Sequence, residues 1–193
     1  MSIQSVCVFC GASPGHDPEF RTAAAELGKS FGNNKIKLIY GGGGAGLMGV
    51  VANSVLKTNG DVTGVIPDYL QERELGHPKL TRLEVVGSMH ERKNRMFDLA
   101  DGIVVLPGGV GTLEEALEVI TWKQLGMHNK PIVILNIKNY WQKLDDLIAA
   151  TIDHGFAAPP TRNLYELVNT SNEVIPTLEK IQQNPINTDL ARL

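Results

Sequence analysis

The sequence predicts a Rossmann-like α/β fold, a three-layer sandwich with a mostly parallel central sheet. Short apolar runs rich in β-branched residues alternate along the chain with longer stretches of helical periodicity. Such alternation is typical of right-handed βαβ units, which place helices on both faces of a parallel sheet. The chain has 193 residues, of which 42% are hydrophobic, enough for one domain with a sizeable core. We expect this domain to span residues 1–184, followed by a poorly ordered polar tail at 185–193.

Each expected strand is a short apolar run, and each expected helix carries apolar residues at helical spacing. The strands are expected at 6–10, 36–40, 62–66, 83–86, 103–106, 132–135 and 165–168. The helices between them are expected at 19–31, 47–58, 90–100, 113–125 and 141–154. A last helix is expected after Ser171, a residue type that caps helices well. The segment 67–81 contains charges, a glycine and two prolines, and is expected to be a loop or a short helix at the sheet edge.

Charge and cysteine usage restrict the function classes. Lys+Arg number 18 and Asp+Glu 21, a net charge of −3, which argues against a general nucleic-acid binder. No apolar run approaches the roughly 18–20 residues that span a bilayer, and the N-terminus does not resemble a signal peptide. We therefore expect a cytoplasmic protein without membrane or nucleic-acid partners. Cys7 and Cys10 lie three apart on one expected strand and should face opposite ways, which favours buried thiols over a redox pair or a metal site.

A first glycine-rich loop, 41–49, follows the second expected strand and precedes a helix. It matches the pattern G-x-G-x-x-G twice, and such glycines let the backbone approach a phosphate. The alternative is a tight strand-to-helix turn with close packing. A dinucleotide site would place this motif after the first strand, with an acidic residue at the end of the next strand. Here the only nearby acid, Asp68, follows a proline in a loop, so no cofactor is expected.

A second glycine-rich loop, 107–112, follows the expected strand at 103–106. Its glycines and Thr112 stand at the start of a helix, an arrangement that suits a phosphate. The G-K-[ST] element of a Mg²⁺–triphosphate site is missing, so a monophosphate fits better. Glu115 has two open interpretations. Spacing alone favours a capping box with Thr112 as N-cap, but a carboxylate beside an anion site could also reach a sugar hydroxyl or a water.

A basic pair opens the expected helix at 90–100. Arg92 and Lys93 lie within its apolar stripe, at i+3 and i+4 from Met89. Charges at such positions either extend out of a packed face or line a pocket. Because both occur together on a sheet with a phosphate-type loop, we interpret them as pocket residues, with Arg92 as a bidentate fork for phosphate. Arg95 faces elsewhere, as a solvated charge.

These motifs resemble a known family. Met-His-Glu-Arg-Lys at 89–93, followed by Pro-Gly-Gly-Val-Gly-Thr-Leu-Glu-Glu at 107–115, resembles the two signatures of the Lonely Guy (LOG) family. Segments 9–13, 41–49 and 118–122 are also similar, and the likeness runs from about residue 6 to 168. Family members hydrolyse the N-glycosidic bond of cytokinin riboside 5′-monophosphates such as N6-isopentenyl-AMP, and some accept AMP. The resemblance implies free base and ribose 5-phosphate as products, a homodimer, and no cofactor or metal.

The resemblance also implies roles for individual residues. The catalytic pair carries over as Arg92 and Glu115. The implied substrate contacts are Lys93, Gly108, Gly109, Gly111 and Thr112, together with Glu74 and Thr121, whose assignment is less direct. The match at Glu74 could shift to the neighbouring Glu72.

Three other functions remain open from the sequence. Lysine decarboxylation requires a Schiff-base lysine, and Lys93 is the only lysine near the expected pocket, where it suits phosphate better. A nucleotide sensor or carrier would keep the second glycine loop but has no need of Glu115. A general AMP nucleosidase of purine salvage would share the mechanism and differ only in the pocket around the N6 group.

Overall fold

A computed structural model describes residues 2–71 and 76–184, and its seven strands form one sheet. The order is β4-β3-β2-β1-β5-β6-β7, and all six pairings are parallel. This confirms the predicted fold class. The strands are β1 (Ser5–Phe9), β2 (Lys37–Tyr40), β3 (Val62–Pro67), β4 (Arg82–Val86), β5 (Gly102–Val105), β6 (Ile132–Leu135) and β7 (Glu166–Val168).

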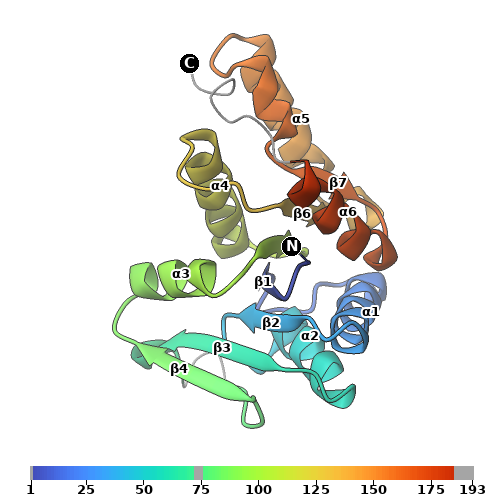
Figure 1. Ribbon diagram of the computed structural model, residues 1–193, viewed down its shortest axis with the longest axis vertical. Coiled ribbons are helices and arrows are strands. Elements are labelled where there is room, and N and C mark those ends of the chain that lie inside the picture. Colours follow the sequence, from blue (N-terminus) through green and yellow to red (C-terminus); the bar gives the residue numbers. More distant parts are fainter. Residues whose placement is uncertain (1, 72–75, 185–193) are drawn as a thin grey trace.

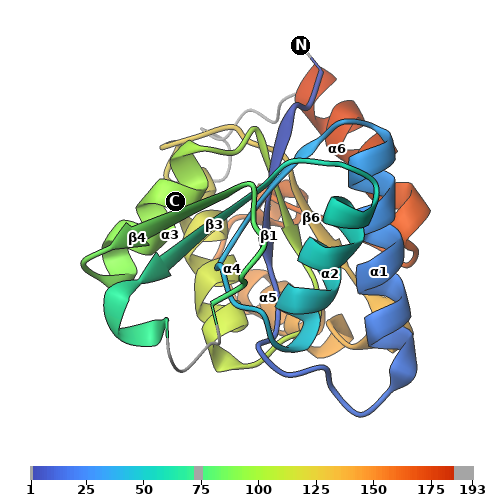
Figure 2. The same ribbon diagram turned by 90° about the horizontal axis from the view of Figure 1, so that it is seen from below.

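Helices cover both faces of the sheet (Figure 1). On one face pack α1 (Pro18–Asn33), α2 (Gly46–Lys57) and α6 (Ser171–Gln183). On the other pack α3 (Met89–Asp98), α4 (Val110–Gln124) and α5 (Gln142–Asp153). The same two groups of helices separate in the view from below (Figure 2). Because both faces are covered, the central strands are apolar throughout, as expected for a parallel sheet.

The chain places a topological switch point between β1 and β5. From β1 the strands run outward in one direction to β4, and from β5 they run outward in the other direction to β7. The loops that follow β1 and β5 therefore separate at this point, where open α/β sheets bind ligands beyond the carboxyl ends of the strands. Cys7 on β1 belongs to the core below α3 and α4, whereas Cys10 belongs to the core below α1 and α2. Both thiols are buried and neither forms a disulfide within the described residues, and the predicted opposite facing is confirmed.

The start of the last helix differs from the expected one by one residue. The N-cap of α6 is Thr170, which forms a capping box with Glu173. Ser171, the expected cap, is instead buried and its Oγ donates to the Ala23 carbonyl at 2.9 Å. The segment after β3 begins with a short 3₁₀ helix, Asp68–Leu70. Residues 72–75 and the expected tail at 185–193 lie outside the described residues. No helix in the described ranges is long and apolar enough to cross a bilayer.

Candidate active site

A cavity of about 740 Å³ opens at the carboxyl ends of the central strands. Its walls come from the loop between β1 and α1, the starts of α2 and α3, and the second glycine loop with the first turns of α4. Two of the expected site residues on helices, Arg92 and Glu115, line this one cavity. The expected residues of the second glycine loop line it as well: Gly108, Gly109, Gly111 and Thr112.

The second glycine loop leaves the N-terminus of α4 open. Gly109 is the N-cap in extended backbone, and no described side chain caps the helix. The first-turn amides of a helix have no acceptor within the helix, and they carry its positive dipole end. A Cβ at Gly109 or Gly111 would meet no atom within 4 Å, so both glycines border open space. This arrangement suits a phosphate or another small oxyanion.

The capping box at Thr112 is wrong. It required the helix to begin after Thr112, but α4 begins at Val110, so Thr112 is its third residue. Gly109, in extended backbone, takes the cap position instead. Thr112 is buried against Gly108, and a Cβ added to Gly108 would lie 2.1 Å from the Oγ1 of Thr112. Glu115 therefore lies in the second turn, half-buried, on the cavity wall. Because Thr112 forms no capping box, the interpretation of Glu115 that stays open is that of a site residue.

Tyr140 was missed by the sequence analysis. Its hydroxyl donates to the Gly108 carbonyl at 2.5 Å, and its ring packs edge-to-face on Phe20 with centroids 5.5 Å apart. Both aromatic side chains line the cavity. The available signal was position, because Tyr140 follows β6 at the same sheet edge as the two glycine loops. The hydroxyl fixes the carbonyl of Gly108 and with it the orientation of the phosphate-type loop.

Arg92 is 5% exposed and is held by backbone carbonyls. Its Nε donates to the Val65 carbonyl at 3.1 Å and its Nη2 to the Gly41 carbonyl at 2.8 Å. Burial raises the pKa of the Cys7 thiol; the charge of Glu115 raises this pKa further, while Lys130 and Arg92 lower it. Both members of the expected catalytic pair therefore lie within electrostatic range of the same buried thiol.

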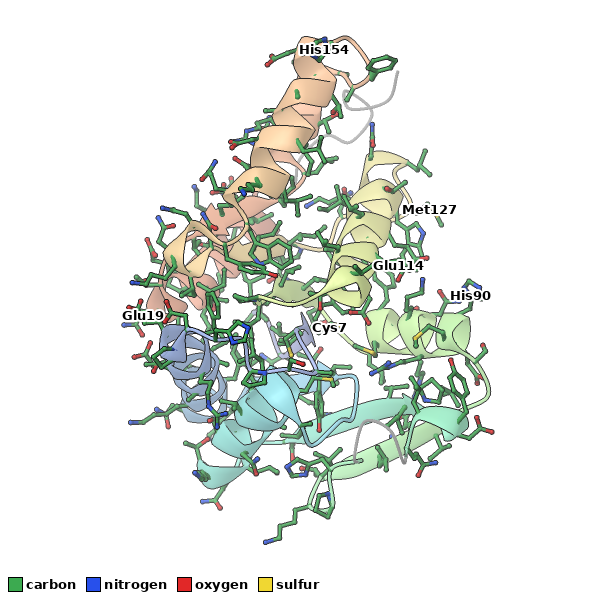
Figure 3. The ribbon with its side chains drawn as sticks, turned by 180° about the vertical axis from the view of Figure 1, so that it is seen from behind. Cys7, Glu19, His90, Glu114, Met127 and His154 are labelled. Atoms are coloured by element: carbon green, nitrogen blue, oxygen red, sulfur yellow. The ribbon has the colours of Figure 1, made fainter. Side chains whose placement is uncertain are left out.

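Lys93 is not brought to the cavity. Its Nζ donates to Glu114 at 2.5 Å and to Glu118 at 3.0 Å, so it ties α3 to α4. Figure 3 shows Glu114 on α4 at the side of α3, the helix that carries His90. Burial alone would lower the pKa of Lys93, but the hydrogen bonds and charges of the two glutamates outweigh burial and raise it.

Of the remaining two expected substrate contacts, one lies away from the cavity and the other is not among the described residues. Thr121 is exposed on α4 and donates to the Leu117 carbonyl at 2.7 Å. Glu74 lies outside the described residues.

The first glycine loop is a packed turn. The amides of Leu47 and Met48, in the first turn of α2, donate to the Gly11 carbonyl at 3.0 and 3.4 Å. Gly46 has φ +58°, and a Cβ there would lie 2.2 Å from the carbonyl carbon of Ala12. The close-packing alternative therefore describes this loop, since the Leu47 and Met48 amides are already bonded within the protein.

One buried lysine has no counterpart in the sequence analysis. Lys123 on α4 is 1% exposed, and its Nζ has no hydrogen-bond partner within the described part of the chain. Burial lowers the pKa of Lys123 to about 8. It lies on the buried face of the helix with Ala116, Val119 and Ile120.

Solved structures share this fold. The protein TM1055 is 25% identical with a TM-score of 0.71, over 94% of this chain and 100% of that one. The molybdenum cofactor carrier protein of Chlamydomonas reinhardtii is 18% identical with a TM-score of 0.69, over 93% and 98% of the two chains. At this identity the second likeness concerns the fold alone.

A family model described as "Possible lysine decarboxylase" matches residues 48–178. The described residues that line the cavity include no lysine. Lys93 is engaged by two glutamates, and Lys123, whose pKa is lowered, is enclosed in the core. Among the described residues, the cavity therefore offers no lysine for a Schiff base, in contrast to the description of the family model.

Curated relatives match most of the chain. Cytokinin riboside 5′-monophosphate phosphoribohydrolase LOG7 of Arabidopsis thaliana is 42% identical over 92% of this chain and 82% of that protein. The probable phosphoribohydrolase LOGL5 of Oryza sativa subsp. japonica is 42% identical over 97% of this chain and 76% of that protein. The family model and these relatives together show that the chain belongs to the LOG family, as its two signatures predicted.

Proposed function

We propose that this protein hydrolyses the N-glycosidic bond of cytokinin riboside 5′-monophosphates such as N6-isopentenyl-AMP, and of AMP, to free base and ribose 5-phosphate. The observation that carries the proposal is the open N-terminus of α4 with Glu115 one turn further on, both on one cavity. The names of the relatives at 42% identity support the same substrate class.

The proposed substrate lies along the start of α4. Its 5′-phosphate binds the open first turn at Gly108–Thr112, where the dipole and backbone amides favour an anion. A helix rises about 1.5 Å per residue, so Glu115 lies about 7.5 Å along the axis from Val110. Side chains tilt back toward the helix N-terminus, which brings the carboxylate over the sugar of a phosphate-anchored nucleotide.

The chemistry needs negative charge at the sugar. As the bond to the base breaks, its electron pair leaves with the base and positive charge develops on the ribose ring. The Glu115 carboxylate stabilises that charge, holds ribose hydroxyls or orients the water that attacks the anomeric carbon. Arg92 binds phosphate or assists departure of the base. Binding energy from the phosphate, remote from the broken bond, contributes to catalysis.

Lys93, Thr121 and Glu74 are also proposed to contact the substrate, although neither Lys93 nor Thr121 lines the cavity. A phosphate contact by Lys93 requires exchange of its ion pairs with Glu114 and Glu118. We propose from the family pattern alone that Glu74 contacts the substrate.

We place the active form as a homodimer in the cytoplasm. Apolar side chains of α4 and its following loop are exposed at Val110 (82%), Leu117 (42%), Leu125 (56%) and Met127 (67%). Figure 3 shows Met127 at the far end of this helix. Thr121 lies exposed between Leu117 and Leu125, so a partner's α4 packed here brings Thr121 to the interface. The test is molar mass by light scattering, with a monomer expected for Leu117→Glu and a dimer for the native chain.

A product assay tests the activity. Purified protein is incubated with N6-isopentenyl-AMP and with AMP, beside a Glu115→Gln control, and free base and ribose 5-phosphate are measured. Release by the native protein alone is expected, and the ratio of the two rates separates cytokinin activation from purine salvage. Bound nucleotide without any release would instead favour a sensor or carrier.

A further inference from the structure

The first glycine loop contacts Arg92, although the Leu47 and Met48 amides of α2 are bonded to the Gly11 carbonyl. The Gly41 carbonyl, at the end of β2, accepts from Nη2 at 2.8 Å, and the Val65 carbonyl on β3 accepts from Nε at 3.1 Å. These two acceptors bind different nitrogens of one planar group, so together they fix both the position and the plane of the guanidinium.

Gly41 is required by space and not by backbone conformation. Its φ does not fall in the left-handed region, in contrast to φ +80° at Gly42. A Cβ at position 41 would lie 2.0 Å from Nη2 of Arg92 and 3.0 Å from its Cζ. The nearest obstructed atom is the end of a long side chain, so a methyl group here displaces the guanidinium first.

We propose that Gly41, together with the Val65 carbonyl, is a positioning residue for Arg92. The first glycine loop then serves the reaction through Arg92. It leaves room for the guanidinium, and its Gly41 carbonyl accepts a hydrogen bond from Nη2. The inference rests on the proposed function in one respect, that Arg92 acts on the nucleotide. It predicts that the effect of a methyl group at position 41 exists only while Arg92 is present.

The test is a double-mutant cycle with Gly41→Ala and Arg92→Ala. A displaced catalytic group costs on the order of 10–100-fold in rate, so kcat/KM of Gly41→Ala for AMP should fall at least about tenfold. The double variant should be no slower than Arg92→Ala within about twofold, since contacting residues are coupled. Gly87→Ala is the matched control: its Cβ would meet Glu91 at an ordinary 3.5 Å, just before α3, and kcat/KM should stay within about twofold.

Two results would overturn the proposal. One is full activity of Gly41→Ala, and the other is additive losses in the double variant. Stability gives a second reading: a Gly41→Ala variant that unfolds while Gly41→Ala/Arg92→Ala folds supports the clash, and two unfolded variants contradict it.

Failure of the proposed function is distinguishable. If the native protein turns over no monophosphate, the same cycle is measured in the Kd for AMP by calorimetry. A loss of affinity in Gly41→Ala that vanishes in the Arg92→Ala background supports the positioning role, and additive losses of affinity overturn it.

Discussion

The two glycine loops look alike in sequence but differ in what the first backbone amides of the following helix bind. Each follows a strand at the same sheet edge and opens a helix, α2 or α4. In the first loop, the amides of Leu47 and Met48 are bonded to the Gly11 carbonyl. In the second loop, no described side chain caps α4, and Gly109 and Gly111 border open space. A glycine pattern therefore shows close backbone approach, and the approaching group can be protein or ligand.

Replacing the carboxylate behind the second loop gives the largest expected effect. Glu115→Gln should lower kcat by roughly 10²–10⁴-fold, because the charge acts in the transition state, and should leave nucleotide affinity largely unchanged. Steady-state kinetics and calorimetry measure the two quantities. Glu26→Gln, exposed on α1 and outside the cavity lining, is the control and should keep its activity. Normal turnover by Glu115→Gln would remove the catalytic assignment.

Removing the phosphate tests whether the second loop is the anchor. Adenosine should be a poorer substrate than AMP by at least about a hundredfold in kcat/KM, since hydrogen bonds to a charged group contribute about 1.5–3 kcal/mol each. The measurement is base release from both compounds at equal concentration. Equal rates would mean that the open end of α4 binds something other than the phosphate.

Adding one methyl group to each loop tests the difference between the two loops directly. Gly46→Ala should lower the free energy of unfolding by about 2–4 kcal/mol, because of φ +58° and the 2.2 Å approach to the backbone of Ala12. Gly111→Ala should leave unfolding within about 0.5 kcal/mol but weaken AMP binding about tenfold. Urea denaturation and calorimetry report both. The comparison fails if the two variants behave alike.

The smallest expected effect concerns Tyr140. Tyr140→Phe keeps the ring against Phe20 and removes one hydrogen bond to the Gly108 carbonyl. A net loss of about 1 kcal/mol corresponds to a rise of roughly fivefold in KM for AMP, with kcat little changed. Tyr69→Phe, whose ring is exposed and lies outside the cavity, serves as control. An unchanged KM would show that the hydroxyl does not hold the loop.

The sheet and helices were predictable because their apolar periodicity is local. Every expected strand and helix exists, with ends shifted by a few residues. The N-terminus of α4 was misplaced because Thr112 and Glu115 satisfy the spacing of a capping box, while an extended glycine caps α4 without any side-chain signal. Spacing cannot distinguish these two starts.

Contacts between elements set the rest of the site. Arg92 and Lys93 are neighbours with equal burial, yet one contacts the carbonyls of β2 and β3 and the other the glutamates of α4. Tyr140 reaches Gly108 across 32 positions of the chain. Such pairings depend on which strands adjoin and are not readable from a single motif.

The buried amine of Lys123 makes the stability of the fold depend on pH. Its pKa is about 8 in the folded chain, against an ordinary value of 10.5. Between these values the unfolded chain binds a proton that the folded chain does not, so the free energy of unfolding rises as the solution becomes alkaline. The rise from this group is about 1.3 kcal/mol between pH 7 and pH 9. At neutral pH the fold therefore carries a protonation penalty, of which mild alkali removes a part.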